Sequence, residues 1–356
     1  MSKTILVNII LVLMISCAKK SNTVVETGVH LNNITTITLK KTEPLFGRFV
    51  EKFRVSESGD LLVFSDRIQD RIFVYDREGN FINVIGERGK GPKGLISVHA
   101  FAITSNNEVY VFDLNQRLFK TFDLNGEVIK SVSFLDEAPF GPIPYEAHIS
   151  NQKIITPIIE SQFLLTPEKS RLLAQINLDG KVDSVFGSFD SFAEEDRHYT
   201  HFTNIAIDEE KDVVYTNLST SPYIQAFDLS DFKKTEYFGI VSKSHSLPTK
   251  EIHPTLPVSE IKRRSVNQTS NVGLYVTDHF IIQHMQILTK EWIDLNDYSA
   301  KENILVLYDK ETYEFSKEIP VEHTLGAVKN NQLYFIEDFN PDNYTIGVYE
   351  ITNEKK

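Results

Sequence analysis

The stretch FRVSESGDLLVFSDRIQDRIFVYDREGNFINVIGERGKGPKGL, residues 53–95, decides the fold of this 356-residue chain. It alternates short apolar runs with turns rich in Gly, Asp and Asn, which is typical of β-strands joined by hairpins. The run Leu61-Leu62-Val63-Phe64 is apolar at every position. Such a strand needs cover on both faces. Because helical patterns are nearly absent, we expect sheets to be covered by other sheets.

Two short signals from this stretch recur along the chain and define a repeat. The first is an aromatic or aliphatic residue, an acidic or amide residue and then a turn: YDREG (75–79), FDLNG (122–126), INLDG (176–180), FDLSD (227–231), YDKET (308–312) and YEITN (349–353). The second is a polar turn before an apolar strand: GDLLVFSD (59–66), NEVYVFDL (107–114), QKIITPII (152–159), KDVVYTNL (211–218), DHFIIQHM (278–285) and NQLYFIED (331–338). Both series therefore give six units.

Six units that each form four antiparallel strands predict an all-β, six-bladed β-propeller over residues 34–356, in which radially stacked sheets cover one another. The last unit supplies only three strands, near 326–328, 333–336 and 345–350. We expect ITTITLKK (34–41) to supply the fourth. The N-terminal strand then pairs with the C-terminal blade and removes two free edges. An open β-sandwich is the alternative.

Residues 53–95 resemble a blade of the NHL-type six-bladed propellers, and more closely of the TolB-like six-bladed propeller lipoproteins. The stretch 86–94 resembles the glycine-rich loop that joins their blades. The resemblance implies the propeller fold and lipid modification. It implies no activity, because this fold carries many unrelated functions.

The start of the chain predicts export. Lys3 precedes an apolar run over 5–15 that is too short to span a bilayer, as in a secretory signal. The residues MISC (14–17) resemble the lipobox of bacterial lipoproteins. That resemblance implies a signal peptide over 1–16, lipid attachment at Cys17 and a lipidated tether over 17–33. A plain secretory signal with an incidental cysteine is the alternative.

The charge and the cysteine content of the chain limit which classes of partner and which cellular compartment we expect. The formal net charge is −12, which argues against nucleic acid and anionic lipid surfaces as partners. Cys17 is the only cysteine, so no disulfide supports the domain and the lipid is the only expected membrane contact. Ala18 and Lys19-Lys20 lack the acidic signals of inner-membrane retention and surface export in such lipoproteins. We therefore expect the periplasmic face of the outer membrane rather than the cell surface.

Two basic groups are candidate contacts for a ligand or partner. The loop GERGKGPKG (86–94) lacks the Ser or Thr of a P-loop, but its glycines could free backbone amides for an anion. Its basic residues are Arg88, Lys90 and Lys93. The segment 239–273 departs from the repeat and predicts a docking arm or lid. Its basic cluster is Lys262, Arg263 and Arg264. A solvated turn and an inert insertion are the alternatives.

Six polar residues fall near the start of the first strand of a unit, where the propeller channel should open: His99, Tyr145, Glu146, His201, Asn204 and His323. Such a ring could bind a divalent metal or polarise a substrate, and it could equally bind only water. Six-bladed lactonase-like enzymes place similar residues around a metal, and the resemblance extends only to Glu146 and Asn204. Apart from that metal, we expect no cofactor.

The sequence favours a lipid-anchored envelope propeller that binds a protein or peptide partner, or acts as a scaffold. No catalytic residue is predicted, because His-Glu-x-x-His, Gly-x-Ser-x-Gly and paired cysteines are all missing from the chain. A metal-dependent envelope hydrolase or lyase with its site at the channel mouth is the second hypothesis. A glycan-binding accessory protein, suggested by Trp292 within LTKEWIDLNDY (288–298), is the third.

Overall fold

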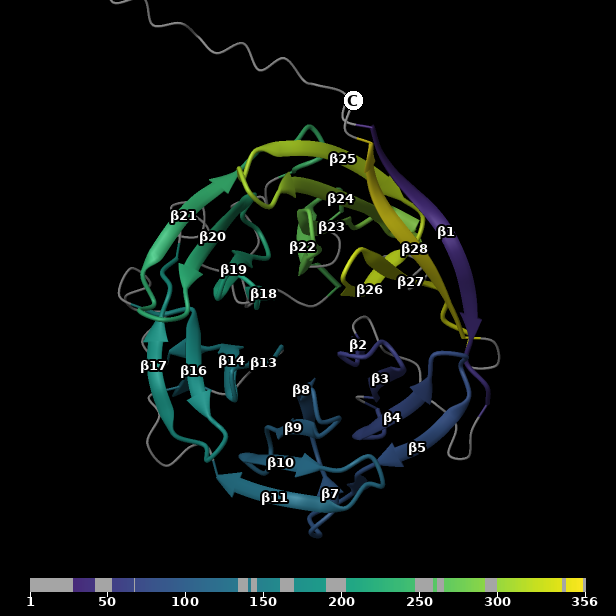
Figure 1. Cartoon of the computed structure of the whole chain (residues 1–356), viewed down its shortest axis with the longest axis vertical. Coiled ribbons are helices and arrows are strands. Elements are labelled where there is room, and N and C mark those ends of the chain that lie inside the picture. The colour runs from purple at the N-terminus through teal and green to yellow at the C-terminus, as the bar shows by residue number, and fades with distance from the viewer. Residues whose placement is uncertain are drawn as a thin grey trace, which may run out of the picture.

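The computed structural model of the chain shows six four-stranded antiparallel sheets standing as blades around a common centre (Figure 1). This confirms the six-bladed propeller that the repeats predict. The structure describes residues 28–41, 53–66, 68–133, 140–141, 146–160, 170–189, 203–246, 259–260, 266–291, 300–340 and 344–354.

The first three blades follow one another along the chain. Blade 1 consists of β2 (Phe53–Val55), β3 (Leu61–Asp66), β4 (Arg71–Asp76) and β5 (Phe81–Ile85). Blade 2 consists of β8 (Val98–Ile103), β9 (Val109–Asp113), β10 (Leu118–Phe122) and β11 (Val128–Ser133). Blade 3 consists of β13 (His148–Ser150), β14 (Lys153–Pro157), β16 (Leu173–Asn177) and β17 (Val182–Phe186).

The other three blades complete the ring. Blade 4 consists of β18 (Thr203–Asp208), β19 (Val213–Leu218), β20 (Tyr223–Asp228) and β21 (Lys234–Gly239). Blade 5 consists of β22 (Thr269–Val276), β23 (Phe280–Ile287), β24 (Glu302–Asp309) and β25 (Phe315–Val321). Blade 6 consists of β26 (Thr324–Lys329), β27 (Gln332–Asp338), β28 (Thr345–Glu354) and β1 (Gly28–Thr38). Two short ladders lie between blades: β6 (Glu87–Arg88) with β7 (Gly94–Leu95), and β12 (Phe140–Gly141) with β15 (Ile159–Glu160).

The two faces of the disc differ in their connections. We call the face where the inner strands β2, β8, β13, β18, β22 and β26 begin the loop face, and the opposite face the turn face. Connections on the turn face are tight, as at 77–80 and 151–152. Those on the loop face include 187–202 and 240–268. The longer connections between strands therefore lie on the loop face.

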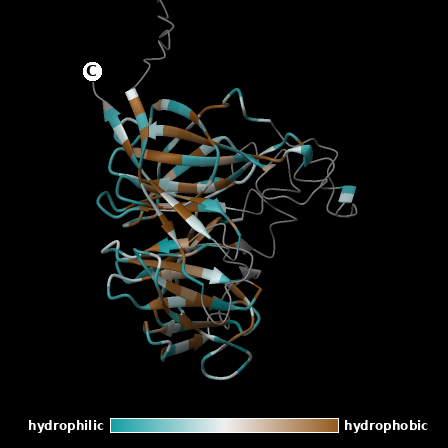
Figure 2. Ribbon diagram, turned by 90° about the vertical axis from the view of Figure 1, so that its right-hand side faces the viewer, coloured by the Kyte–Doolittle hydropathy of each residue, from teal (hydrophilic) through white to brown (hydrophobic). Residues whose placement is uncertain are grey.

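The hydrophobic core is divided among the interfaces between neighbouring blades. Blades 6 and 1, for example, share a cluster in which Phe53 stacks on Phe64 with ring centroids 4.7 Å apart and meets Tyr334 edge-on at 6.2 Å. Figure 2 shows apolar residues along the strands and hydrophilic residues in the turns. Each sheet is thus apolar on both faces because each is covered on both, as the unalternating runs predict.

Glycines in the outer turns let neighbouring blades approach closely. Gly79, in the β4–β5 turn, has φ +81°, and a Cβ there would lie 2.3 Å from the carbonyl oxygen of Thr38. Gly180, in the β16–β17 turn, has φ +86°, and a Cβ there would lie 2.8 Å from the carbonyl oxygen of Ser133. Only glycine accepts both the backbone angle and the contact.

The ring closes through β1, which pairs antiparallel with β28 from Gly28↔Glu354 to Thr38↔Thr345. Closure by the N-terminal strand is confirmed, although β1 begins at Gly28 and so includes residues that the sequence assigned to the tether. The sixth turn signal, YEITN, lies inside β28 and makes no turn. The strand that would follow such a turn comes instead from the other end of the chain.

The predicted signal peptide and Cys17 lie outside the described residues. Within the described ranges, no helix is long and apolar enough to cross a membrane.

Deleting residues 28–38 should unfold the domain, because the outer edge of blade 6 would lose its partner strand. A milder test uses two isoleucines of β1, of which Ile37 is 7% exposed and Ile34 is 50% exposed. Ile37→Ala should lower the free energy of unfolding by about 2–4 kcal/mol, because it removes a buried side chain. Ile34→Ala should change it by less than about 0.5 kcal/mol. Urea denaturation followed by circular dichroism measures both, and equal effects would contradict the role given to β1.

Candidate functional site: the polar channel and the loop face

Arg54 of blade 1 reaches across the centre of the ring. Its Nη2 donates to the carbonyl oxygen of Ala147 at 3.1 Å and lies 3.2 Å from Nε2 of His148. Both partners belong to blade 3, and blade 2 lies between the two in the ring (Figure 1). The guanidinium therefore connects two blades that are not neighbours.

Glu146 is the carboxylate of this cluster. Its side chain is 4% exposed, and Oε1 lies 3.6 Å from Nη2 of Arg54. Oε2 accepts a hydrogen bond from the amide of Ile205 in blade 4 at 3.2 Å. One carboxylate thus links blades 1, 3 and 4.

His148 has two competing partners for one nitrogen. Its Nε2 lies 3.2 Å from Nη2 of Arg54 and 3.4 Å from Oε1 of Glu146. Nε2 without a hydrogen accepts from Arg54, whereas Nε2 with a hydrogen donates to Glu146. The tautomer of this ring therefore decides which of the two contacts is a hydrogen bond.

The polar layer continues from blade 4 to blade 5 through amide side chains. Nδ2 of Asn204 donates to Oδ1 of Asn217 at 3.0 Å and to the carbonyl oxygen of Asn271 at 3.1 Å. Nδ2 of Asn271 donates to the carbonyl oxygen of Leu218 at 2.7 Å, and its Oδ1 accepts from Gln283 at 2.9 Å. All of these side chains are buried. These hydrogen bonds join the two blades, while Nδ2 of Asn217 is buried without a partner among the described residues.

A second set of amides extends the layer to blade 6. Oδ1 of Asn303 lies 3.0 Å from Nε2 of His284 and accepts from Nε2 of Gln286 at 3.0 Å. Gln286 also donates to Oγ1 of Thr324 in blade 6 at 3.3 Å, and it accepts from Lys301 at 3.1 Å. The inner part of the ring is therefore joined by hydrogen bonds from blade 3 round to blade 6.

The structure brings together two of the six predicted channel residues. Glu146 and Asn204 occupy adjacent parts of the polar layer, because the amide that Glu146 binds belongs to the residue after Asn204. His323 is 29% exposed and lies 3.9 Å from Glu322. The side chain of His99 and all of Tyr145 and His201 lie outside what the structure describes.

Arg54 and His148 were missed by sequence reasoning. The only available signal in the sequence was that Arg54 is a charged residue between two apolar ones, in the short strand Phe53–Val55. In the described part of the chain, no cluster of three or more His, Cys, Asp or Glu side chains could hold a metal ion. Glu146 instead has the partners of a carboxylate that holds blades together.

The glycine-rich loop is arranged around a buried lysine. Lys120 of β10 is 2% exposed, and its Nζ donates to the carbonyl oxygens of Gly91, Pro92 and Gly94 at 3.2, 3.2 and 2.5 Å. Burial lowers the pKa of Lys120, although the Asp113 carboxylate opposes that shift. The loop therefore turns carbonyl oxygens inward to a cation.

Some of the amides of the same loop are engaged by carbonyls of residues 91–95. The amide of Glu87 donates to the carbonyl of Lys93, and that of Gly89 donates to the carbonyl of Leu95, both at 3.0 Å. Arg88 and Lys90 are exposed, and Lys93 forms an ion pair with Glu127. Lys262, Arg263 and Arg264 lie outside the described residues.

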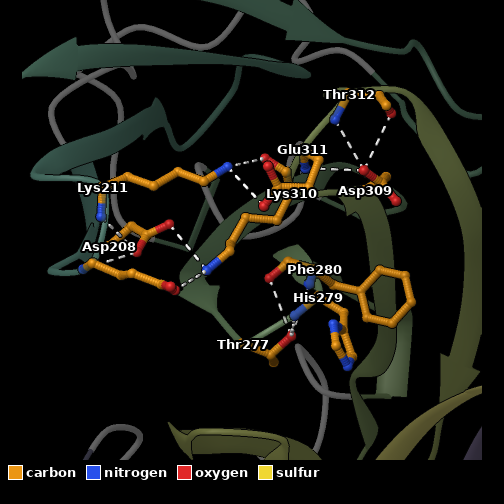
Figure 3. A network of polar contacts seen from close by, with 10 residues as sticks. Asp208, Lys211, Thr277, His279, Phe280, Asp309, Lys310, Glu311 and Thr312 are labelled. Carbon is orange, nitrogen blue, oxygen red and sulfur yellow. Dashed lines mark hydrogen bonds and ion pairs between the residues drawn. The ribbon is translucent and has the colours of Figure 1, made fainter.

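A charged cluster on the turn face joins blades 4 and 5 (Figure 3). Nζ of Lys310 lies 3.2 Å from Oδ2 of Asp208, and the two side chains are 5% and 4% exposed. Glu210 lies 3.4 Å from the same Nζ, and Lys211 pairs with Glu311 at 2.9 Å. Burial lowers the pKa of Lys310, but Asp208 and Glu210 together raise it further, to above its ordinary value. The cluster clamps two blades.

These features define the chain as a closed six-bladed β-propeller whose inner polar groups connect the blades. The sequence family described as DUF5128, 6-bladed beta-propeller, matches residues 15–148. No curated protein matches the chain significantly.

Two solved structures share the fold. A member of the DUF4221 family from Bacteroides vulgatus ATCC 8482 is 13% identical, with a TM-score of 0.69, and the match covers 91% of this chain and 99% of that one. A protein of Bacteroides fragilis NCTC 9343 described as exported is 12% identical, with a TM-score of 0.58, and the match covers 92% of this chain and 96% of that one. At these identities the likeness shows the fold alone.

Arg54→Met should destabilise the propeller by about 2–3 kcal/mol, because it removes a charged donor from a buried carboxylate. Arg77→Met is the matched control, since Arg77 is 67% exposed and its ion-pair partner, Glu78, is exposed too. It should cost less than about 1 kcal/mol. Equilibrium urea unfolding distinguishes the two, and an Arg54→Met variant as stable as the control would show that the cross-channel contact contributes little.

Lys310→Met should cost about 3–5 kcal/mol, because Asp208 would be left buried without its cation. Adding Asp208→Asn should restore much of the loss, whereas Lys211→Met should cost less than about 1 kcal/mol. The raised pKa of Lys310 means that its contribution is fully present below pH 10.5, the ordinary lysine value, and is lost as the pH rises through the higher folded value. Unfolding curves of wild type and Lys310→Met should therefore converge only above pH 10.5. Convergence at neutral pH would refute the clamp.

Proposed function

We propose that this chain is an exported, lipid-anchored propeller that recognises a protein or peptide partner with its loop face. The proposal rests on the difference in loop length between the two faces. Connections on the turn face, such as 77–80 and 151–152, are short, whereas those on the loop face include 187–202 and 240–268. Long connections on a rigid scaffold are where proteins place recognition. A function of the turn face would not need them.

The polar channel supports a scaffold better than a reactive site. Glu146 is bound by Arg54 and the amide of Ile205, and Asn204 by two neighbouring asparagines. Groups engaged in this way hold the blades in fixed positions. A rigid platform reduces the ordering cost of binding a partner.

Export and anchoring are inferred from the start of the chain. The apolar run over 5–15, the MISC sequence and the resemblance to TolB-like propeller lipoproteins support lipid attachment at Cys17. The exported protein of Bacteroides fragilis with the same fold supports the same compartment. We place the anchor at the periplasmic face of the outer membrane. Contacts to the partner would come from Arg88 and Lys90 and from the basic cluster 262–264.

Replacing residues 247–265 by a short Gly-Ser linker tests this proposal. Ser246 and Thr269 are held together by two hydrogen bonds, of 2.9 and 3.2 Å, so a short linker can span the gap without disturbing β22. Cross-linking of the tagged, lipidated protein in intact cells should recover one envelope protein in near-stoichiometric amount, and the linker variant should lose it. The melting temperature should stay the same.

The matched control changes the turn face instead, with Asp231→Ala and Lys233→Ala, and should keep the partner. If the linker variant retained the partner, or if the control lost it equally, the loop face would not be the recognition surface. If the purified domain held a stoichiometric divalent metal that Glu146→Gln released, the metal-dependent hydrolase or lyase would replace the proposal.

A further inference from the structure

A cavity of about 230 Å³ lies at the outer rim, between blades 1 and 2, and we call it the rim cavity. Its lining includes Arg71, Gly86, Glu87, Lys93, Asn125 and Gly126. The volume is below the roughly 300–1,000 Å³ of pockets for drug-sized ligands. The rim cavity therefore suits a smaller molecule or a single functional group.

Arg71 is the unusual member of the lining. It begins β4 and is half-buried. Among the residues that the structure describes, none accepts a hydrogen bond from its side chain or pairs with it, and its Nε is inaccessible to solvent. A buried donor without an acceptor costs about 1–3 kcal/mol, so native structures rarely leave one. The buried Nε itself is out of reach of a ligand, but an oxyanion in the rim cavity would give an acceptor to the part of the guanidinium that lines it.

Lys93 supplies a second cation to the rim cavity. Its present partner is Glu127, and the two side chains are 39% and 64% exposed. The hydrogen bond and charge of Glu127 raise the pKa of Lys93, so the ammonium stays charged at neutral pH. An exposed ion pair contributes little to stability. Lys93 can therefore exchange Glu127 for a ligand at low cost.

Two glycines line the cavity with backbone alone. Gly86 and Gly126 have φ +86° and +80° and contribute no side chain. Asn125 donates to Asp123 only at 3.4 Å, a long contact that leaves its amide available for a ligand. Cations, an amide donor and bare backbone are the usual surroundings of a bound oxyanion.

We propose that the rim cavity binds a small oxyanion between Arg71 and Lys93, either a carboxylate or a phosphate or sulfate group. Lys93 is the only basic residue of the glycine-rich loop in this lining, and the carbonyls that bind Lys120 belong to residues outside it. Glu87 also lines the cavity, and its carboxylate opposes an anion. Because Glu87 repels a negative ligand, the effect of replacing Glu87 on the affinity tests whether the ligand is an anion. The proposal does not depend on the partner of the loop face.

The test is isothermal titration calorimetry of the purified full chain with inorganic phosphate, sulfate, acetate and glucuronate, at constant ionic strength set with chloride. Arg71→Gln should weaken binding at least tenfold, and Lys93→Gln several-fold. Glu87→Gln should strengthen binding two- to fivefold, because it removes a like charge. Arg77→Gln, an exposed arginine of the same blade, should leave binding unchanged. Preference among the four anions separates a tetrahedral oxyanion from a carboxylate.

Stability without ligand provides an independent readout. Arg71→Gln should keep or raise the melting temperature in chloride, because no described contact is lost, and it should abolish the increase that the bound anion gives wild type. Binding that is unchanged in Arg71→Gln, or no binding of any of the four anions at millimolar concentration, would overturn the proposal. So would weaker binding in Glu87→Gln, since an anion cannot gain from that carboxylate.

Discussion

The whole ring depends on the pairing of its first and last strands. The other five blades are each built from one continuous part of the chain, but blade 6 joins Gly28–Thr38 to Thr345–Glu354. Bringing such distant segments together has an entropic cost that no local hairpin bears. Only Val29 and Ile37 of β1 are buried hydrophobic residues. Backbone hydrogen bonds of the ladder therefore provide most of the interaction between β1 and β28. The stability of every blade interface is therefore coupled to a strand with little side-chain packing.

The centre of the ring is organised by polar contacts instead of apolar packing. Arg54, Glu146 and Ile205 come from three different blades and meet through an ion pair and a hydrogen bond. Such contacts have narrow distance and angle requirements, and they are expensive to break when buried. Apolar clusters between the blades supply stability that depends little on exact geometry, whereas the inner polar layer fixes which blade faces which. The two kinds of contact thus do different work in one ring.

The turns and blade count were predictable from sequence because their causes are local. Oδ1 of Asp76 accepts the amides of Glu78 and Asn80, so an Asp-to-Gly pattern a few residues long specifies the turn. The start of β1 was less predictable, because half of its residues before Ile34 are exposed and the segment resembles a tether. Such a segment becomes a strand only through its distant partner.

The site residues were harder to predict for the same reason. Arg54 and Glu146 are 92 positions apart in the sequence and meet across the ring. Arg71 and Gly126 line one cavity from neighbouring blades. No local pattern marks either pair, whereas the alignment of weak repeats did place Glu146 and Asn204 near the centre. Residues whose role depends on ring geometry become recognisable only after the ring is built.

The pairing of β1 also determines how the domain would respond to force. Gly28 lies opposite Glu354, so both ends of the described chain leave from the same end of the same strand pair. Tension between the segment before Gly28 and the C-terminal end would load that first pair of residues and then the next, as in opening a zipper, instead of loading the whole ladder in shear. Sequential opening requires less force than simultaneous rupture of all the hydrogen bonds. For a disc held by its N-terminus and pulled at its C-terminal end, the mechanical weak point is therefore the strand that closes it.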